Sequence, residues 1–287
     1  MGRENEMKKQ APRGRKLPLT NSGALSLFPV GCGSAFTKRL YQNNFLIVKG
    51  NDHLMIDCGT RTPEALAKLG RSVTEIDTWL ITHSHADHIG GLEEVMLTGR
   101  YVARRKPSVI ITPEYEAILW EHSLKGGSAF NEVHGGENLG FADFWNVIRP
   151  TPLHEYPRDT HEVNVGSINI KMVRTRHYPE QARDWTESAY SVGLIVDDRI
   201  FFTGDTQFDP DLLTGYDAVF NFDYIFHDVQ FFTGGVHAGL DELCTLPDSL
   251  KSRIVLMHYP DNFQRYRKRI TREGFAGFAQ QGRFHVF

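Results

Sequence analysis

Cysteine and long apolar runs are both scarce in this chain of 287 residues. Its three cysteines, Cys32, Cys58 and Cys244, are an odd number at wide spacing, which argues against a disulfide framework. The reducing cytoplasm is therefore the expected location. No apolar stretch approaches the ~18 residues of a transmembrane helix, and the basic residues 1–16 lack the apolar segment of a secretory signal. We therefore expect neither secretion nor a membrane partner.

An excess of charge of one sign is also missing. The formal net charge is −3, and only the N-terminus holds a run basic enough to suggest contact with a polyanion. A hydrophobic content of 40% suffices for a large core in one domain. Residues 1–20 hold six basic side chains among few apolar groups, so they are predicted to be a disordered tail. Residues 21–287 are predicted to form one domain, with an insertion at about 126–165.

The segment Thr82–His88 is dense in metal-binding side chains. It follows the apolar run Ile76–Ile81, which is typical of a strand, and precedes Ile89–Leu97, which is typical of a helix. This places the segment on a strand-to-helix loop at the end of a sheet, where α/β proteins carry their sites. Imidazole and carboxylate groups suit zinc and similar divalent ions. The candidate ligands are His83, His85, Asp87 and His88.

These four side chains are too many for one ion to bind easily. The period of two in the loop directs His83 and His85 one way, while the helical turn directs Asp87 and His88 another. Two adjacent metal ions are therefore the natural interpretation.

Later apolar runs also end at histidine or aspartate, which predicts that these side chains share one edge of a sheet. The runs and the residues that follow them are Ser167–Val173 with His177, Arg199–Phe202 with Asp205, Tyr224–Phe226 with Asp228, and Ile254–Met257 with His258. Ala218–Phe220 is predicted to be a further strand, and Phe45–Val48 to pair with Leu54–Asp57 as a hairpin. Thr62 is predicted to cap a helix.

The pattern H-x-H-x-D-H after a strand resembles the signature of the metallo-β-lactamase superfamily. The resemblance implies an α/β fold, the αββα sandwich. It also implies a first zinc on His83, His85 and His177, and a second on Asp87, His88 and His258. Asp205 would bridge the two zinc ions, for which manganese is an alternative, and a hydroxide between them would attack the substrate. Asp57 would orient the first histidines from behind.

Within the superfamily, Phe28–Ala35, Asn43–Phe45 and Gly234–Ala238 look similar to the branch of RNase Z and the cyclic-nucleotide phosphodiesterases. Leu119–Gly127 is similar to phage anti-Pycsar proteins and their bacterial relatives, which cleave 3′,5′-cyclic nucleotides. The resemblance implies a phosphodiesterase in which His237 protonates the leaving oxygen. The implied catalytic residues are Asp87, His237 and its supporting residue Asp228.

Other functions stay open. A tRNA 3′-processing endonuclease would use the same chemistry, but the chain lacks the long basic arm with which RNase Z grips tRNA, and residues 126–165 are of mixed charge. A small nucleotide therefore fits better, with the insertion, or the same loop from the second subunit of a homodimer, closing over it. A nucleotide-binding sponge would not need a complete set of ligands, and thioester hydrolysis is a minor alternative.

Overall fold

The computed structural model describes residues 7–287, which divide into two compact units. One, here called the His83 unit, comprises Lys8–Gly31, Asn44–Pro150 and Gly282–Phe287. The other, here called the His258 unit, comprises Met7, Cys32–Asn43 and Thr151–Gln281. Each unit is built around its own eight-stranded sheet.

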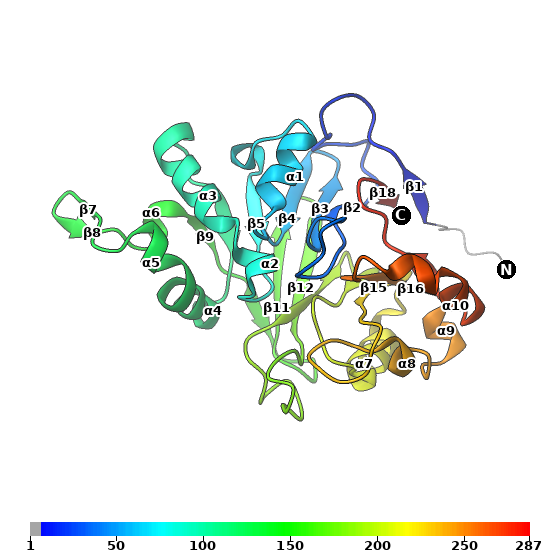
Figure 1. Ribbon diagram of the computed structural model, residues 1–287. Coiled ribbons are helices and arrows are strands. Elements are labelled where there is room, and N and C mark those ends of the chain that lie inside the picture. Colours follow the sequence, from blue (N-terminus) through cyan, green and yellow to red (C-terminus); the bar gives the residue numbers. More distant parts are fainter. Residues whose placement is uncertain (1–6) are drawn as a thin grey trace. The chain divides into compact units, whose positions relative to one another are not determined.

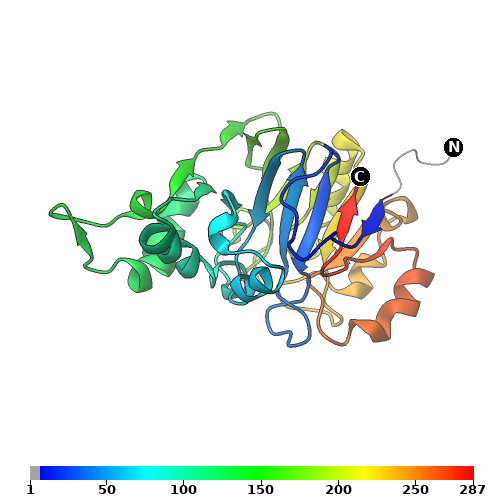
Figure 2. The same ribbon diagram turned by 90° about the horizontal axis from the view of Figure 1, so that it is seen from above.

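The sheet of the His83 unit has the strand order β1-β18-β2-β3-β4-β5-β6-β9 (Figures 1 and 2). From β1 to β4 in this order, adjacent strands are antiparallel; β5, β6 and β9 extend the sheet in parallel from β4. The bounds are β1 Lys8–Gln10, β2 Ser26–Gly31, β3 Asn44–Lys49, β4 Asp52–Ile56, β5 Thr78–Leu80, β6 Ser108–Ile110, β9 Asn146–Ile148 and β18 Phe284–Val286.

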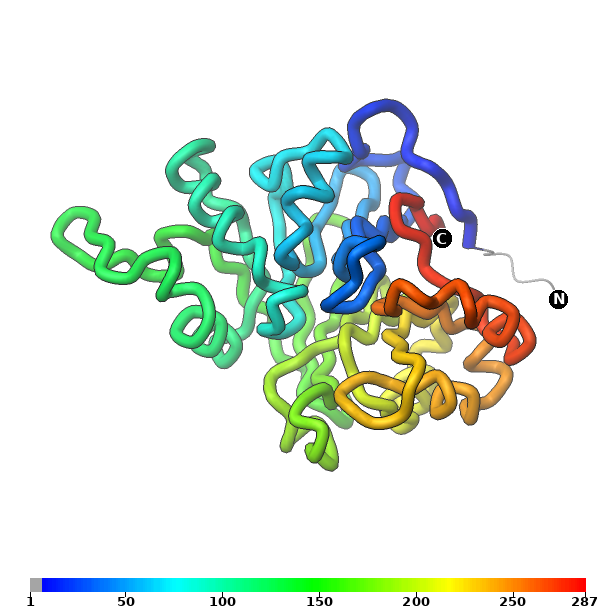
Figure 3. The backbone as a smooth tube through the Cα atoms, viewed as in Figure 1, coloured from blue at the N-terminus to red at the C-terminus, as the bar shows by residue number. Residues whose placement is uncertain are grey.

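Short helices connect the parallel strands of this unit. They are α1 Thr62–Lys68, η1 Val73–Glu75, α2 Ala86–Ile89, α3 Leu92–Leu97, η2 Thr98–Ala103, α4 Pro113–Leu119, η3 Trp120–Leu124, α5 Lys125–Ser128 and α6 Phe141–Phe144. A small hairpin, β7 Val133–His134 with β8 Glu137–Asn138, lies at the far end of this helical segment from the sheet of the same unit (Figure 3).

The sheet of the His258 unit runs in sequence order from β10 to β17. Strands β10 to β14 are antiparallel, and β14 to β17 are parallel. The strand bounds are β10 Thr151–Leu153, β11 Thr160–Val165, β12 Ile168–Arg174, β13 Val192–Val196, β14 Ile200–Phe202, β15 Tyr224–Asp228, β16 Ile254–Met257 and β17 Gly277–Phe278. The helices are α7 Pro210–Phe220, α8 Leu240–Leu243, α9 Asp248–Lys251, η4 Phe263–Tyr266 and α10 Arg267–Arg272.

Most predicted strands are present, because their apolar runs fill the buried cores of the two sheets. The strand predicted at Ala218–Phe220 is wrong: these residues end helix α7. The Asp209 side chain accepts a hydrogen bond from the Leu212 N–H, and Pro210 opens the helix, so its start carries both signals of a helix N-terminus.

The predicted cap of α1 is also wrong. Arg61 occupies the capping position and Thr62 is the first helical residue. The Thr62 hydroxyl donates instead to the buried Asn44 Oδ1, so it is not available to the backbone N–H groups of the helix.

The structure of the predicted tail (residues 1–20) and of the predicted insertion (residues 126–165) differs from what the sequence suggested. Residues 1–6 of the tail lie outside the described residues. Strand β1 pairs with β18, and Leu17 is buried with its N–H on the Leu69 carbonyl, so this stretch is held by the sheet and by α1. Residues 126–150 belong to the His83 unit, and 151–165 supply β10 and β11 to the other. A single domain over 21–287 stays a prediction.

Among the residues that the structure describes, no helix has both the length and the apolar composition of a membrane span.

Candidate active site

In the His83 unit, the buried carboxylate of Asp57 organises the loop after β5. Its Oδ1 accepts the Thr82 N–H at 2.7 Å, and its Oδ2 accepts the Thr82 hydroxyl at 2.8 Å and lies 2.7 Å from Nδ1 of His88. The Thr82 hydroxyl is in turn 3.0 Å from Nδ1 of His83. Burial raises the pKa of the Asp57 carboxyl, and the charge and hydrogen bond of His88 oppose this rise. Asp57 thus orients His88 directly and His83 through Thr82.

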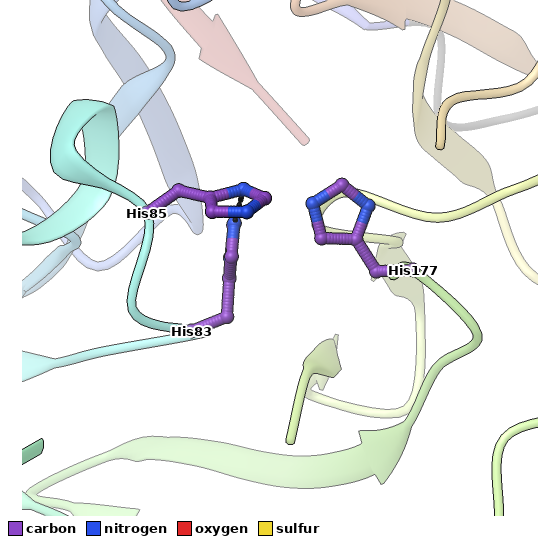
Figure 4. Close-up of side chains that lie close together, drawn as sticks. All are labelled: His83, His85 and His177. Carbon is purple, nitrogen blue, oxygen red and sulfur yellow. Dashed lines mark hydrogen bonds between the residues drawn. The ribbon is translucent and has the colours of Figure 1, made fainter. Parts of the chain in front are cut away.

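The four candidate ligands of this loop lie close together. Nε2 of His83 is 3.1 Å from Nδ1 of His85, the contact drawn dashed in Figure 4. The ring of His83 is 4.1 Å from that of His88, and Nε2 of His88 is 3.3 Å from Oδ2 of Asp87. The Asn44 amide donates to the Asp87 carbonyl at 3.1 Å, which ties β3 to this turn. All of the four except His85 are buried.

In the His258 unit, the predicted residues gather around the buried Asp205, which follows β14. Its Oδ2 lies 3.3 Å from Nε2 of His258, 3.9 Å from Nδ1 of His237 and 4.0 Å from Nε2 of His177. Each comes from a loop after a strand, and His177 is drawn in Figure 4 on the loop that follows β12. The prediction that His177, Asp205 and His258 follow strands is therefore confirmed, while Asp228 is the last residue of β15.

Two details of this cluster indicate that its side chains are preorganised to bind a ligand. Nδ1 of His177 is 2.8 Å from the Val236 carbonyl oxygen, which can only accept, so Nδ1 carries the hydrogen and Nε2 keeps its lone pair. His258 has φ of 54°, a left-handed conformation that costs a residue with a Cβ about 1–2 kcal/mol. Such strain is most often found at functional sites.

His237 and Asp228 form a pair beside this cluster. Nδ1 of His237 is 2.9 Å from Oδ2 of Asp228, which also accepts the Thr206 N–H at 3.2 Å. Burial raises the pKa of the Asp228 carboxyl, but hydrogen bonds and charge from His227 and His237 outweigh it and hold the pKa below its usual value. Asp228 is therefore a carboxylate, and it accepts the Nδ1–H of His237.

A pocket of about 180 Å³ opens beside His237 and His258. Ser34, Phe36, Gln230 and Phe232 line it together with these histidines. None of these four lining residues is predicted from the sequence to be a site residue, because only their folding next to His237 and His258 distinguishes them from ordinary loop residues.

The side chains of both clusters fit divalent ions. They offer imidazole nitrogen and carboxylate oxygen without thiolate, the donors that zinc and manganese take from histidine and aspartate. Within the His258 unit, Oδ2 of Asp205 lies 3.3 Å from Nε2 of His258 and 4.0 Å from Nε2 of His177. The His83 unit presents two imidazole nitrogens to each other at 3.1 Å, a spacing suited to sharing a cation.

Comparison with known proteins shows to which family the chain belongs. The family described as anti-Pycsar protein Apyc1 matches residues 25–285. The chain belongs to that family. The anti-Pycsar protein of Bacillus phage BSP38 is 39% identical over 263 residues, which cover 90% of this chain and 96% of the phage protein.

Solved structures show the fold of this chain. The metallo-β-lactamase fold protein YhfI from Bacillus subtilis matches with a TM-score of 0.63 and 14% identity, covering 92% of this chain and all of its own. A diphosphatase from the PhnP family matches with a TM-score of 0.66 and 16% identity, over 92% of this chain and 98% of its own. The predicted α/β metallo-β-lactamase fold is confirmed. Family, fold and the histidine and aspartate clusters also agree with the predicted class of metal-dependent hydrolase.

Proposed function

We propose that the protein hydrolyses 3′,5′-cyclic mononucleotides with two divalent metal ions, zinc or manganese. The observation that carries the proposal is the set of three imidazoles around the buried Asp205, one of them held by a second carboxylate, Asp228. Membership in the anti-Pycsar family supports a cyclic nucleotide as the substrate. The proposed metal ligands are His83, His85, Asp87, His88, His177, Asp205 and His258.

Two bound ions would supply an activated water and neutralise charge on the phosphoryl oxygens. The protein's own groups hold the ligands and the acid. Asp57 fixes the ring of His88, and the Val236 carbonyl fixes that of His177. His237, bonded to Asp228 through Nδ1, holds a proton at Nε2 for the leaving ribose oxygen. The oxygen of a hydroxide formed from water bonds to phosphorus, the phosphorus–ribose oxygen bond breaks, and the ribose oxygen takes the proton of His237. The proton that the water released returns to the ring through solvent, and a nucleoside monophosphate leaves.

Processing of tRNA 3′ ends is the second candidate, and one feature of the His258 unit favours it. A group of exposed cations lies near the pocket residue Pro260, since the Asp261 carboxylate accepts the backbone N–H groups of Lys38 and Arg39. The other cations follow on η4 and α10. This basic group consists of Lys38, Arg39, Arg265, Arg267 and Lys268. This group, whose members come from two separate stretches of the chain, is not predicted from the sequence and could bind phosphates of a longer substrate.

A homodimer in the cytoplasm is also part of the proposal. Exposed apolar side chains of the η2-to-β7 segment, which a second subunit would cover, support the dimer. They are Tyr101, Val102, Phe130 and Val133. The three free cysteines suit a reducing compartment. Light scattering after size-exclusion chromatography should give twice the chain mass; the mass of one chain would refute the dimer.

A reconstitution experiment tests the function. The purified protein is stripped with a chelator, reloaded with zinc or manganese, and incubated with a 3′,5′-cyclic mononucleotide while the products are separated by chromatography. Metal-dependent formation of the nucleoside monophosphate is expected. No turnover with either metal, at full metal content, would refute the proposal.

A further inference from the structure

Two phenylalanines at the pocket beside His237 are exposed to an unusual degree. Phe36 has 87% of its surface exposed and Phe232 has 66%, although both line a pocket. Two large apolar side chains at one pocket rarely remain this exposed unless they contact a ligand or partner. Both belong to the His258 unit, as do all the residues that line this pocket.

The backbone holds both phenylalanines in place. Before Phe36, the Ser34 N–H donates to the Tyr259 carbonyl at 3.1 Å, and the Thr37 hydroxyl donates back to the Ser34 carbonyl at 2.8 Å. Before Phe232, the N–H of the buried Gln230 donates to the Ala238 carbonyl at 2.9 Å. The two rings are therefore presented by fixed loops, which lowers the entropy lost on binding.

The Gln230 side chain closes the second loop. Its amide nitrogen donates to the Gly234 carbonyl, and the Gly235 N–H donates to the Glu180 carboxylate at 2.7 Å. Both glycines have φ near +90°, which a residue with a side chain rarely adopts. The amide nitrogen of Gln230 is already bonded within the loop, so it does not face a ligand as a free donor. Ala35, Val229 and Pro260 supply apolar surface to the pocket.

We propose that Phe36 and Phe232 form a base-binding subsite, in which their rings hold the nucleobase of the substrate while its phosphodiester lies at His237. This inference rests on the proposed function. A nucleobase is flat, and its faces stack on aromatic side chains whatever hydrogen-bonding groups its edge carries. A nucleobase therefore suits this small apolar pocket, which is flanked by two phenylalanines and lies next to His237, the proposed acid.

Truncation of each ring tests the subsite. Phe36→Ala and Phe232→Ala should each raise KM for a 3′,5′-cyclic mononucleotide about 5- to 100-fold, the range for losing one base stack, with a smaller change in kcat. Neither should alter kcat/KM for 1-deoxyribose 3′,5′-cyclic phosphate, which has the same ring and phosphodiester but no base. Phe36→Trp should restore KM. Val219→Ala, which shortens a similarly exposed apolar side chain on helix α7, away from the pocket and from the proposed dimer surface, is the control.

The outcomes separate the subsite from the proposed function. Unchanged KM in both alanine variants, or equal losses on the nucleotide and on the abasic analogue, would overturn the subsite. If the wild type turns over neither, the proposed function fails. The subsite is then tested by calorimetry with a nucleoside 5′-monophosphate: weaker binding by the alanine variants upholds it, and equal binding overturns it.

Discussion

Nδ1 of His237 lies 2.9 Å from Oδ2 of Asp228, a carboxylate that solvent does not reach. A carboxylate can only accept, so the shared hydrogen belongs to His237 and its Nε2 is directed elsewhere. The contact fixes the orientation of the imidazole, and a group that donates a proton to a leaving oxygen must be held in such a fixed position.

Replacing His237 should remove the proton donor for the leaving oxygen and leave the metal content unchanged. We expect His237→Ala to keep its fold and metal content but to lose about 10²–10⁴-fold in turnover of a cyclic nucleotide, the range for loss of a general acid. The loss should shrink with a p-nitrophenyl phosphodiester, whose leaving group needs no proton. Steady-state kinetics on both substrates checks this, and an equal loss on both would give His237 another role.

Replacing Asp228 should have a weaker effect of the same kind, because Asp228 acts through His237. Asp228→Asn should lower kcat about 10- to 100-fold, the usual cost of removing an orienting partner, with little change in KM. The loss should again be smaller with the p-nitrophenyl substrate. If the variant instead loses both substrates equally while remaining folded by circular dichroism, Asp228 does not act through the leaving-group acid.

Asp205 should control metal content. Its Oδ2 lies within 4.0 Å of three imidazole nitrogens, so Asp205→Ala removes the carboxylate shared by both proposed ions. Elemental analysis should find about two metal ions per wild-type chain, and the variant should lose metal and activity together. One tightly bound metal with full activity would contradict a two-metal mechanism.

The buried His285 on β18 should make stability depend on pH. Burial, aided by the charge of Lys9, lowers the pKa of His285 to about 4, against about 6.5 in an unfolded chain. Between these values the unfolded chain binds a proton that the folded chain does not. Stability is therefore complete above pH ~6.5 and falls as the pH drops toward 4, by on the order of 3 kcal/mol.

His285→Leu should flatten this dependence in urea unfolding followed from pH 7 to pH 4.5, whatever its effect on absolute stability. His134→Leu, at an exposed position, is the control and should keep the wild-type slope. The same slope in wild type and His285→Leu would show that His285 does not cause it.

Local patterns predict the loop that carries the first candidate ligands. His83 to His88 are neighbours in the chain between two apolar runs, so their spacing alone indicates a shared site. His177, Asp205 and His258 were predictable from the strands that precede them, given the resemblance. Other features depend on long-range contacts: β1 becomes a strand only through pairing with β18, at the other end of the chain. Phe36 and Phe232 likewise meet at one pocket through folding, with no signal in either local sequence.

The central claim is that the substrate is a cyclic mononucleotide, and a comparison of substrates across a salt series tests it most directly. Zinc- or manganese-loaded protein is given a 3′,5′-cyclic mononucleotide and a precursor tRNA side by side, from low to moderate salt. A cyclic nucleotide offers one negative charge, so we predict its turnover with a KM that changes little with salt, and poor cleavage of tRNA. Binding of the nucleotide without turnover would indicate a sponge. Efficient tRNA cleavage that falls steeply with salt, with no cyclic-nucleotide turnover, would contradict the claim and favour tRNA processing.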